Sequence, residues 1–178
     1  MTAPSVEKIE WFRKEFRPHF EKWVFGPIDR LVSSPDALIG FIFMTCAIDY
    51  LAGFYWGIDT KKENKKAYRE FIDIYFETNK YDSKGLYDSL RNGLVHLFTI
   101  KGRKYTLTQA RAELHLQTDS VGQIILNAES FRDDLVVARN KYFNDVEGNS
   151  ELMDKLRERI NRDGFLGPMP IIVSNSKT

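Results

Sequence analysis

Residues 37–56 constrain the fold more than any other segment, because they form a run that is apolar on nearly every side. A helix of this composition either crosses a membrane or lies at the centre of a helical bundle. Asp49 lies deep in the run and would cost about 3 kcal/mol at the middle of a bilayer. The run also follows Ser34-Pro35-Asp36, a capped helix start typical of soluble proteins. We therefore expect a buried central helix and no membrane association.

Five further segments have the spacing of apolar side chains, every three to four residues, that predicts a helix. They cover residues 5–25, 61–79, 84–97, 127–147 and 150–164. Pro18 is expected to kink or split the first segment, and Gly26-Pro27 to end it. Asp82-Ser83 and Asn127 provide helix caps, and Gly148-Asn149 separates the last two helices.

The apolar period changes between residues 98 and 126. Residues 97–100 and 104–107 predict two strands joined by a glycine-containing turn, and residues 112–117 and 121–126 alternate or cluster as strands do. The sequence therefore predicts a mainly α fold, a helical bundle of five to six helices with a small antiparallel β insert at about residues 98–126. We expect one helical domain at residues 1–164, followed by a C-terminal tail at residues 165–178.

Charge and cysteine content limit the possible partners and the location. The formal net charge is +1, so a nucleic-acid site has to be a local patch. The single cysteine, Cys46, cannot form an intramolecular disulfide, and its apolar surroundings predict a small buried side chain. The N-terminus has no apolar core of the signal-peptide type. These features together predict a cytoplasmic protein.

The helix at 84–97 carries the main chemical signal. At 100° per residue, one arc of this helix is apolar and is expected to face the core, and the opposite arc is polar. The apolar arc comprises Leu86, Leu90, Gly93, Leu94 and Leu97, and the polar side Asp88, Ser89, Arg91, Asn92 and His96. Gly93 costs about 1 kcal/mol relative to alanine in a helix, so we expect another backbone to approach it closely.

Arg91, Asn92 and His96 suit one reaction. The arginine fork binds a phosphate and stabilises a phosphorane, while a histidine moves protons at neutral pH. Asn92 adds a neutral donor for orientation. These groups allow a ribose 2′-hydroxyl to attack the adjacent phosphodiester without a metal. One copy supplies one histidine at this site, so a symmetric homodimer is expected to provide both the base and the acid.

The pattern Arg91-Asn92-x-x-x-His96 on a helix, with a polar residue directly after the arginine, resembles the Arg-x(4–6)-His motif of the HEPN superfamily. The resemblance implies a helical bundle that dimerises across its active site and acts as a metal-independent RNA endonuclease. It also implies a toxin–antitoxin or phage-defence role, with an antitoxin protein as a partner. The β insert is not part of that common core. Arg91, Asn92 and His96 take the catalytic roles in this interpretation.

The neighbourhood of the motif is basic, which suits RNA. Residues 80–104 hold four more positive than negative charges, and the expected RNA-binding side chains are Lys84, Lys101, Arg103 and Lys104. Asp49 is expected either to pair with a cation from another helix or to be held by backbone donors, and a role in orienting Arg91 or His96 from behind is open as well. A second match, Arg13 with His19, contains Pro18 and lacks the polar follower, so we do not assign it a function.

Other readings of these residues are open. The polar face of residues 84–97 and the lysine-rich segment after it are also typical of a solvated surface, which predicts a non-catalytic binding or scaffolding protein. His115 is read as a polar strand residue, and the lysines of residues 61–66 as a solvated helix start. Phosphate loops, zinc-ligand pairs and dinucleotide fingerprints are missing from the sequence, so we expect no metal and no cofactor.

Overall fold

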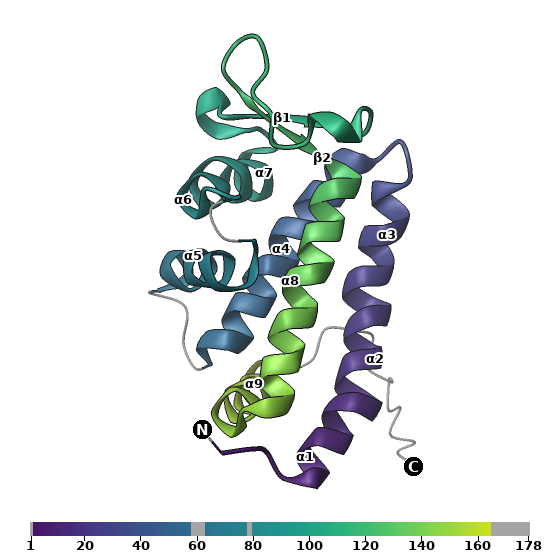
Figure 1. Ribbon diagram of the computed structural model, residues 1–178, viewed down its shortest axis with the longest axis vertical. Helices are drawn as coiled ribbons and strands as arrows, with labels where there is room; N and C mark the ends of the chain where they lie inside the picture. Colours follow the sequence, from purple (N-terminus) through teal and green to yellow (C-terminus); the bar gives the residue numbers. More distant parts are fainter. Residues whose placement is uncertain (1, 58–62, 78–79, 165–178) are drawn as a thin grey trace, which may run out of the picture.

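The computed structural model describes residues 2–57, 63–77 and 80–164 and confirms the mainly α fold (Figure 1). The predicted tail at 165–178 lies outside the described residues, as do the two ends of the helix predicted at 61–79. Long helices pack side by side, and a small β element lies across one end of the molecule (Figure 1).

The N-terminal part of the chain forms one continuous helical column from Val6 to Val32. It consists of α1 (Val6–Trp11), α2 (Arg17–Phe20) and α3 (Gly26–Val32), joined by π-helical turns at Phe12–Phe16 and Glu21–Phe25. The prediction that Gly26-Pro27 ends this helix is wrong. Pro18 and Pro27 both stand in the first turn after a π-helical segment. Proline removes one helical hydrogen bond and its ring crowds the preceding turn. The wider π-helical turn directly before each proline gives the ring room, so the chain stays helical past both.

Helix α4 (Ala37–Trp56) is the central helix that the sequence predicts. It packs against α3, α5 (Asn64–Tyr75), α8 (Ala128–Gly148) and α9 (Ser150–Asp163). Among the described residues, it is the one helix long and apolar enough to cross a membrane, but 61% of its apolar window is buried inside the protein. That burial is what the core helix of a soluble protein shows. The core around it is rich in aromatic rings, with Phe16, Phe20 and Phe143 in mutual contact.

The predicted helix at 84–97 is present as α6 (Ser83–Gly85), a π-helical turn (Leu86–Arg91) and α7 (Asn92–Leu97). Asparagine and aspartate side chains cap three helices, and the caps at Asp82 and Asn127 are those that the sequence predicts. Asp82 accepts from the Gly85 N–H, Asn127 from the Ser130 N–H and Asn149 from the Glu151 N–H, each at 3.0 Å. These caps fix where α6, α8 and α9 begin.

The β insert is present, but its strands are parallel and not antiparallel. Strand β1 (Tyr105–Thr108) pairs with β2 (Ile124–Asn127), with Tyr105 opposite Ile124. The segments expected to be strands at 97–100 and 112–117 include the end of α7 and a 3-10 turn. Because β1 and β2 run in the same direction, residues 109–123 form a crossover. At the far end of this crossover, the Asp119 side chain accepts hydrogen bonds from the backbone N–H groups of Val121 and Gln123.

The chain reverses over Gly93 directly after α7. A Cβ on Gly93 would overlap the Thr99 carbonyl oxygen and would lie 2.9 Å from the Lys101 nitrogen, so only glycine fits. The Thr99 N–H also donates to the Gly93 carbonyl at 3.2 Å. The close backbone approach predicted from Gly93 is therefore confirmed. Leu97, which was expected to face the core, is 57% exposed because α7 ends at this residue and the reversal begins.

Candidate functional site

The π-helical turn Leu86–Arg91 and helix α7 bring Arg91, Asn92 and His96 together. The Arg91 Nη1 atom donates to the Asn92 Oδ1 atom at 3.0 Å and lies 2.9 Å from the His96 Nε2 atom. Leu86, Leu90 and Leu94 on the other side of this helix are fully buried. The amphipathic pattern thus fixes which side carries the polar group, but periodicity at 100° per residue does not anticipate the π-helical turn. Such turns are frequent at functional sites.

Asp49 holds Arg91 from the core side. The Arg91 Nε atom donates to the Asp49 Oδ2 atom at 2.6 Å, and the two side chains are 14% and 18% exposed. Burial raises the pKa of the Asp49 carboxyl group, and Arg91 opposes that shift. Burial by itself lowers the pKa of the Arg91 guanidinium, but the Asp49 carboxylate outweighs it and the net direction is upward. Arg91 therefore stays a cation, fixed in position by a half-buried anion.

The contact between Arg91 and His96 determines which ring nitrogen carries the proton. An arginine side chain only donates hydrogen bonds, so the His96 Nε2 atom accepts and is unprotonated in this arrangement. His96 is exposed and Asn92 half-buried. The Arg91 Nη2 atom has no hydrogen bond to a described residue, and it is not buried. One nitrogen of the guanidinium is thus left for a ligand.

The four predicted RNA-binding residues differ in their surroundings. Lys84, Lys101 and Arg103 are exposed, and no ion pair ties them to any residue that the structure describes. Lys104 instead pairs with Asp82, which holds the pKa of that carboxyl group below its ordinary value. The 3-10 turn Lys101–Arg103 packs next to the π-helical turn that ends at Arg91. Two exposed cations, Lys101 and Arg103, therefore follow the chain reversal that packs on the helix carrying Arg91 and His96.

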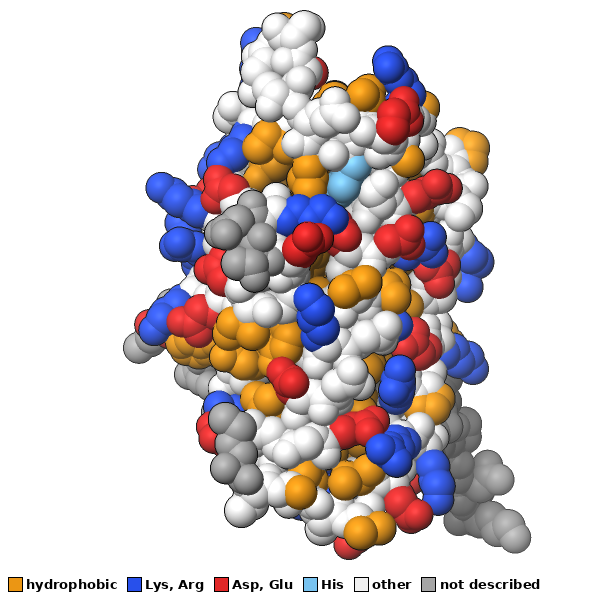
Figure 2. Space-filling view, in the orientation of Figure 1, with side chains coloured by type: hydrophobic (Ala, Val, Ile, Leu, Met, Phe, Trp, Pro, Cys, Tyr) orange, Lys and Arg blue, Asp and Glu red, His pale blue; other side chains and the backbone are white. Residues whose placement is uncertain are grey.

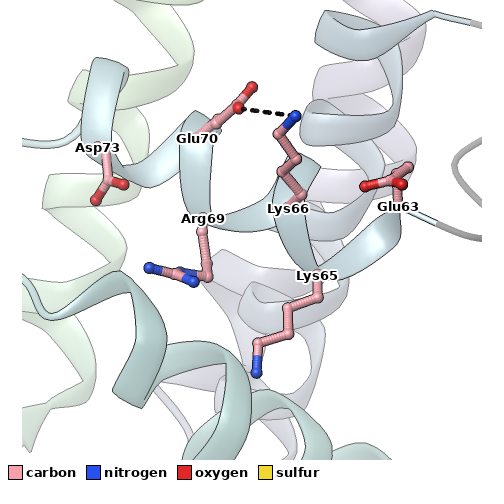
Figure 3. Close-up of a pocket in the computed structure, with 6 residues that line it drawn as sticks. All are labelled: Glu63, Lys65, Lys66, Arg69, Glu70 and Asp73. Carbon is pink, nitrogen blue, oxygen red and sulfur yellow. Dashed lines mark ion pairs between the residues drawn. The ribbon is translucent and has the colours of Figure 1, made fainter.

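The lysines near the start of α5 are surrounded by both acidic and basic side chains. A depression of about 480 Å³ on this helix is lined by both signs, from Glu63, Lys65, Lys66, Arg69, Glu70 and Asp73. Figure 3 shows Lys66 directed toward Glu70. The Lys66 Nζ atom lies 4.0 Å from the Glu70 Oε1 atom. Lys65 pairs with Asp88 at 2.8 Å. Their charges are balanced locally, as expected for a solvated helix face, and Figure 2 shows similar mixing of charges over the face that it presents. Lys61 and Lys62 lie outside the described residues.

His115 is not a strand residue and was misjudged as a simple polar side chain. Its side chain is 8% exposed. Its Nδ1 atom accepts the Asn127 N–H at 3.0 Å, and its Nε2 atom lies 2.8 Å from the Tyr81 hydroxyl. Tyr81 donates in turn to Asp134 at 2.5 Å, and Lys80 donates to the same carboxylate at 3.0 Å. This network ties the β insert to α8. Its members are far apart in the sequence, so no local pattern signals it.

Cys46 is exposed, so the prediction of a buried thiol is wrong. Helix α4 is apolar all round, and such a run does not indicate which side faces the core. Burial raises the pKa of the Cys46 thiol, Asp49 adds to that effect and Arg91 partly opposes it, so the three groups are neighbours. Cys46 also lines an apolar groove of about 320 Å³ between α4 and the N-terminal column. The other lining residues are Trp23, Val24, Ile42, Phe43, Ala47 and Tyr50.

No family model matches the chain, and no curated protein or solved structure matches it either. Among the described residues, no group of three or more histidine, cysteine, aspartate or glutamate side chains is placed to hold a metal ion.

Proposed function

We propose that this protein is a metal-independent RNA endonuclease of the HEPN type, with Arg91, Asn92 and His96 as its catalytic residues. One observation carries the proposal. The Nε2 atom of a surface histidine lies 2.9 Å from an arginine whose position is fixed by a half-buried carboxylate. This arrangement supports the proposal, because cleavage without a metal needs a proton acceptor beside a phosphate-binding group.

The chemistry proceeds by displacement within the substrate. The substrate phosphate takes over the Arg91 Nη1 and Nη2 donors, which releases the His96 Nε2 lone pair. His96 removes the ribose 2′-hydroxyl proton, the 2′-oxygen bonds to phosphorus, and the bond to the 5′-oxygen breaks. The 5′-oxygen leaves with a proton from a protonated His96 of a second copy. The products carry a 2′,3′-cyclic phosphate and a 5′-hydroxyl. Asn92 accepts from Arg91 and keeps the guanidinium plane in position.

The exposed apolar side of α4 supports a homodimer in which two such sites meet. Leu38 is 49% exposed, and Ile39 and Phe43 are each 43% exposed. Ile42, Cys46 and Asp49 follow one another at spacings of four and three residues, so they lie on one side of the helix. The apolar surface therefore runs directly to the Asp49–Arg91 pair. A second copy docked on it buries apolar groups and brings the second His96 to the same cleft.

The test is cleavage of RNA by purified protein in EDTA, with the product ends analysed. We expect cyclic-phosphate ends in wild type and a loss of about 10²- to 10⁴-fold in His96→Ala, the range for a general acid–base group. Arg91→Lys keeps the charge but loses the fork, and it should also lose activity. His19→Ala, in the second Arg–His match, is the matched control and should cleave normally. Folded wild type that leaves RNA intact in these assays contradicts the proposal.

Dimerisation is tested separately by light scattering and by the distance between the two copies of His96 in a crystal. Phe43→Glu is expected to yield monomers that fold but do not cleave. A dimer in which the two His96 side chains open onto unconnected surfaces contradicts the mechanism. A cytoplasmic location and an antitoxin protein as a partner belong to the same proposal, and co-purification of a bound protein from the native host tests the latter.

The alternative function is a non-catalytic helical binding or scaffolding protein. The observation that favours it is the burial of Arg91, whose side chain is only 14% exposed and pairs with Asp49 as structural ion pairs do. In this alternative, His96→Ala lowers stability or association, and wild type has no RNA turnover to lose. Thermal unfolding of His96→Ala beside the cleavage assay separates the two functions.

A further inference from the structure

Phe98 has an unusual position for a large apolar residue. It follows the last residue of α7, its side chain is 74% exposed, and its backbone is left-handed, with φ at 51°. Glycine or asparagine ordinarily occupies this position after a helix, because other side chains are strained there. Phe98 therefore combines backbone strain with an exposed ring. Strain of this kind is concentrated at functional sites.

The backbone that carries the Phe98 ring is fixed in position. The Thr99 N–H donates to the Gly93 carbonyl, and residues 99–101 lie against the glycine so closely that a Cβ would not fit. Ile100 packs against the core. The ring is thus held by a pinned chain reversal between His96 and the exposed cations Lys101 and Arg103.

We propose that Phe98 is a stacking platform for an unpaired base, which makes the site selective for single-stranded RNA. This inference rests on the proposed ribonuclease function. Residues two apart have Cα atoms no more than about 7.6 Å from each other, so a base next to a phosphate at His96 can reach the ring. Exposed aromatic side chains bind splayed-out bases of single strands, whereas the bases of a duplex stack on each other and are closed to it.

The neighbouring charges complete a short track for a single strand. Arg91 binds the reacting phosphate, Phe98 the adjacent base, and Lys101 and Arg103 the next phosphates. All four residues belong to a segment of thirteen residues, 91–103, that includes α7, the chain reversal and the 3-10 turn. Local basic charge of this kind supplies affinity without sequence preference.

The test uses Phe98→Asn, with Phe98→Trp as the conservative variant and Val121→Asn as the matched control. Val121 is 76% exposed in the crossover of the β insert. The probe is a 2′-O-methyl oligonucleotide, which cannot be cleaved, used as a single strand and as a duplex. We expect Phe98→Asn to bind the single strand about 5- to 150-fold more weakly, the effect of losing one stacked base. Phe98→Trp and Val121→Asn should bind as wild type does.

The thermal stability of Phe98→Asn provides a second readout. If Phe98 served only to stabilise the fold, the variant would lose stability, whereas a strained binding residue predicts a gain. Asparagine suits the left-handed position, so Phe98→Asn should raise Tm by about 2–4 °C while it weakens binding. A fall in Tm together with unchanged binding overturns the inference. So does conversion of the protein to a monomer, because Phe98 is then a subunit contact. Binding of wild type to anionic vesicles but not to the single strand also overturns it.

Cleavage distinguishes this inference from the function on which it rests. If Phe98→Asn cleaves single strands as fast as wild type and binds the probe equally well, the ribonuclease stands and the stacking platform falls. If wild type binds the probe through Phe98 but never cleaves RNA, the stacking platform stands and the ribonuclease falls.

Discussion

Gly93→Ala tests the chain reversal that organises the site. The new Cβ would lie 2.9 Å from the Lys101 nitrogen and closer still to the Thr99 carbonyl oxygen, inside the 3.0 Å limit of real Cβ contacts. Both atoms belong to backbone, so residues 99–101 have to move by roughly an ångström, and such overpacking costs about 1–3 kcal/mol. The hydrogen bond from Thr99 to Gly93 contributes about 1 kcal/mol more.

A gain in helix propensity of about 1 kcal/mol offsets part of this cost. The net expectation is a loss of about 1–3 kcal/mol of unfolding free energy, or a fall in Tm of about 2–12 °C. Urea unfolding followed by circular dichroism and tryptophan fluorescence measures it. The matched control is Gly148→Ala, where a Cβ would have open space and stability should hold or rise. Gly93→Ala at least as stable as wild type would refute the reasoning.

Three further predictions concern stability and are measured by urea unfolding. Asn127→Ala removes the buried cap of α8 and should cost about 1–2 kcal/mol; an unchanged midpoint contradicts the assigned cap. Burial works against ionisation of Asp134, but hydrogen bonds from His115, Tyr81 and Lys80 lower its pKa to about 2. A lowered carboxyl pKa stabilises the protein above the unfolded value, so about 2 kcal/mol should be lost as the pH falls from about 4 to 2. Asp134→Asn should make the unfolding free energy less dependent on pH in this range. An equally steep loss in the variant would show that Asp134 does not cause the pH dependence. Arg139→Ala removes a guanidinium that lies 4.3 Å from the Phe25 ring centroid, and should cost about 1–3 kcal/mol; a loss below about 0.5 kcal/mol would show that the contact contributes little.

Local signals in the sequence predicted much of the helical architecture. Asn127 marks the start of α8 because a cap is a contact between neighbours in the chain. Gly93 indicated a close backbone approach because its propensity cost calls for a compensating contact. The spacing of residues 84–97 placed Arg91, Asn92 and His96 on the polar side of one helix, but it did not show that Arg91 and His96 meet or that the helix contains a π-helical turn.

Features that depend on distant parts of the chain were not predictable in the same way. The direction of pairing between β1 and β2 depends on a crossover of residues 109–123, in which the alternation at 112–117 predicted a strand that the structure does not contain. The exposed side of α4 cannot be identified from an all-apolar run, so Cys46 was misplaced. The contact of Asp49 with Arg91 spans 42 positions, and the sequence left open which cation Asp49 meets.

The position of Cys46 makes the association of two chains measurable without any substitution in the sequence. The sequence contains one cysteine, and its thiol is exposed on the apolar side of α4. In a homodimer docked on this surface the thiol is covered, so its rate of reaction with a small maleimide reports the association of two chains in solution. Since burial raises the pKa of the thiol, labelling should proceed faster in mildly alkaline buffer.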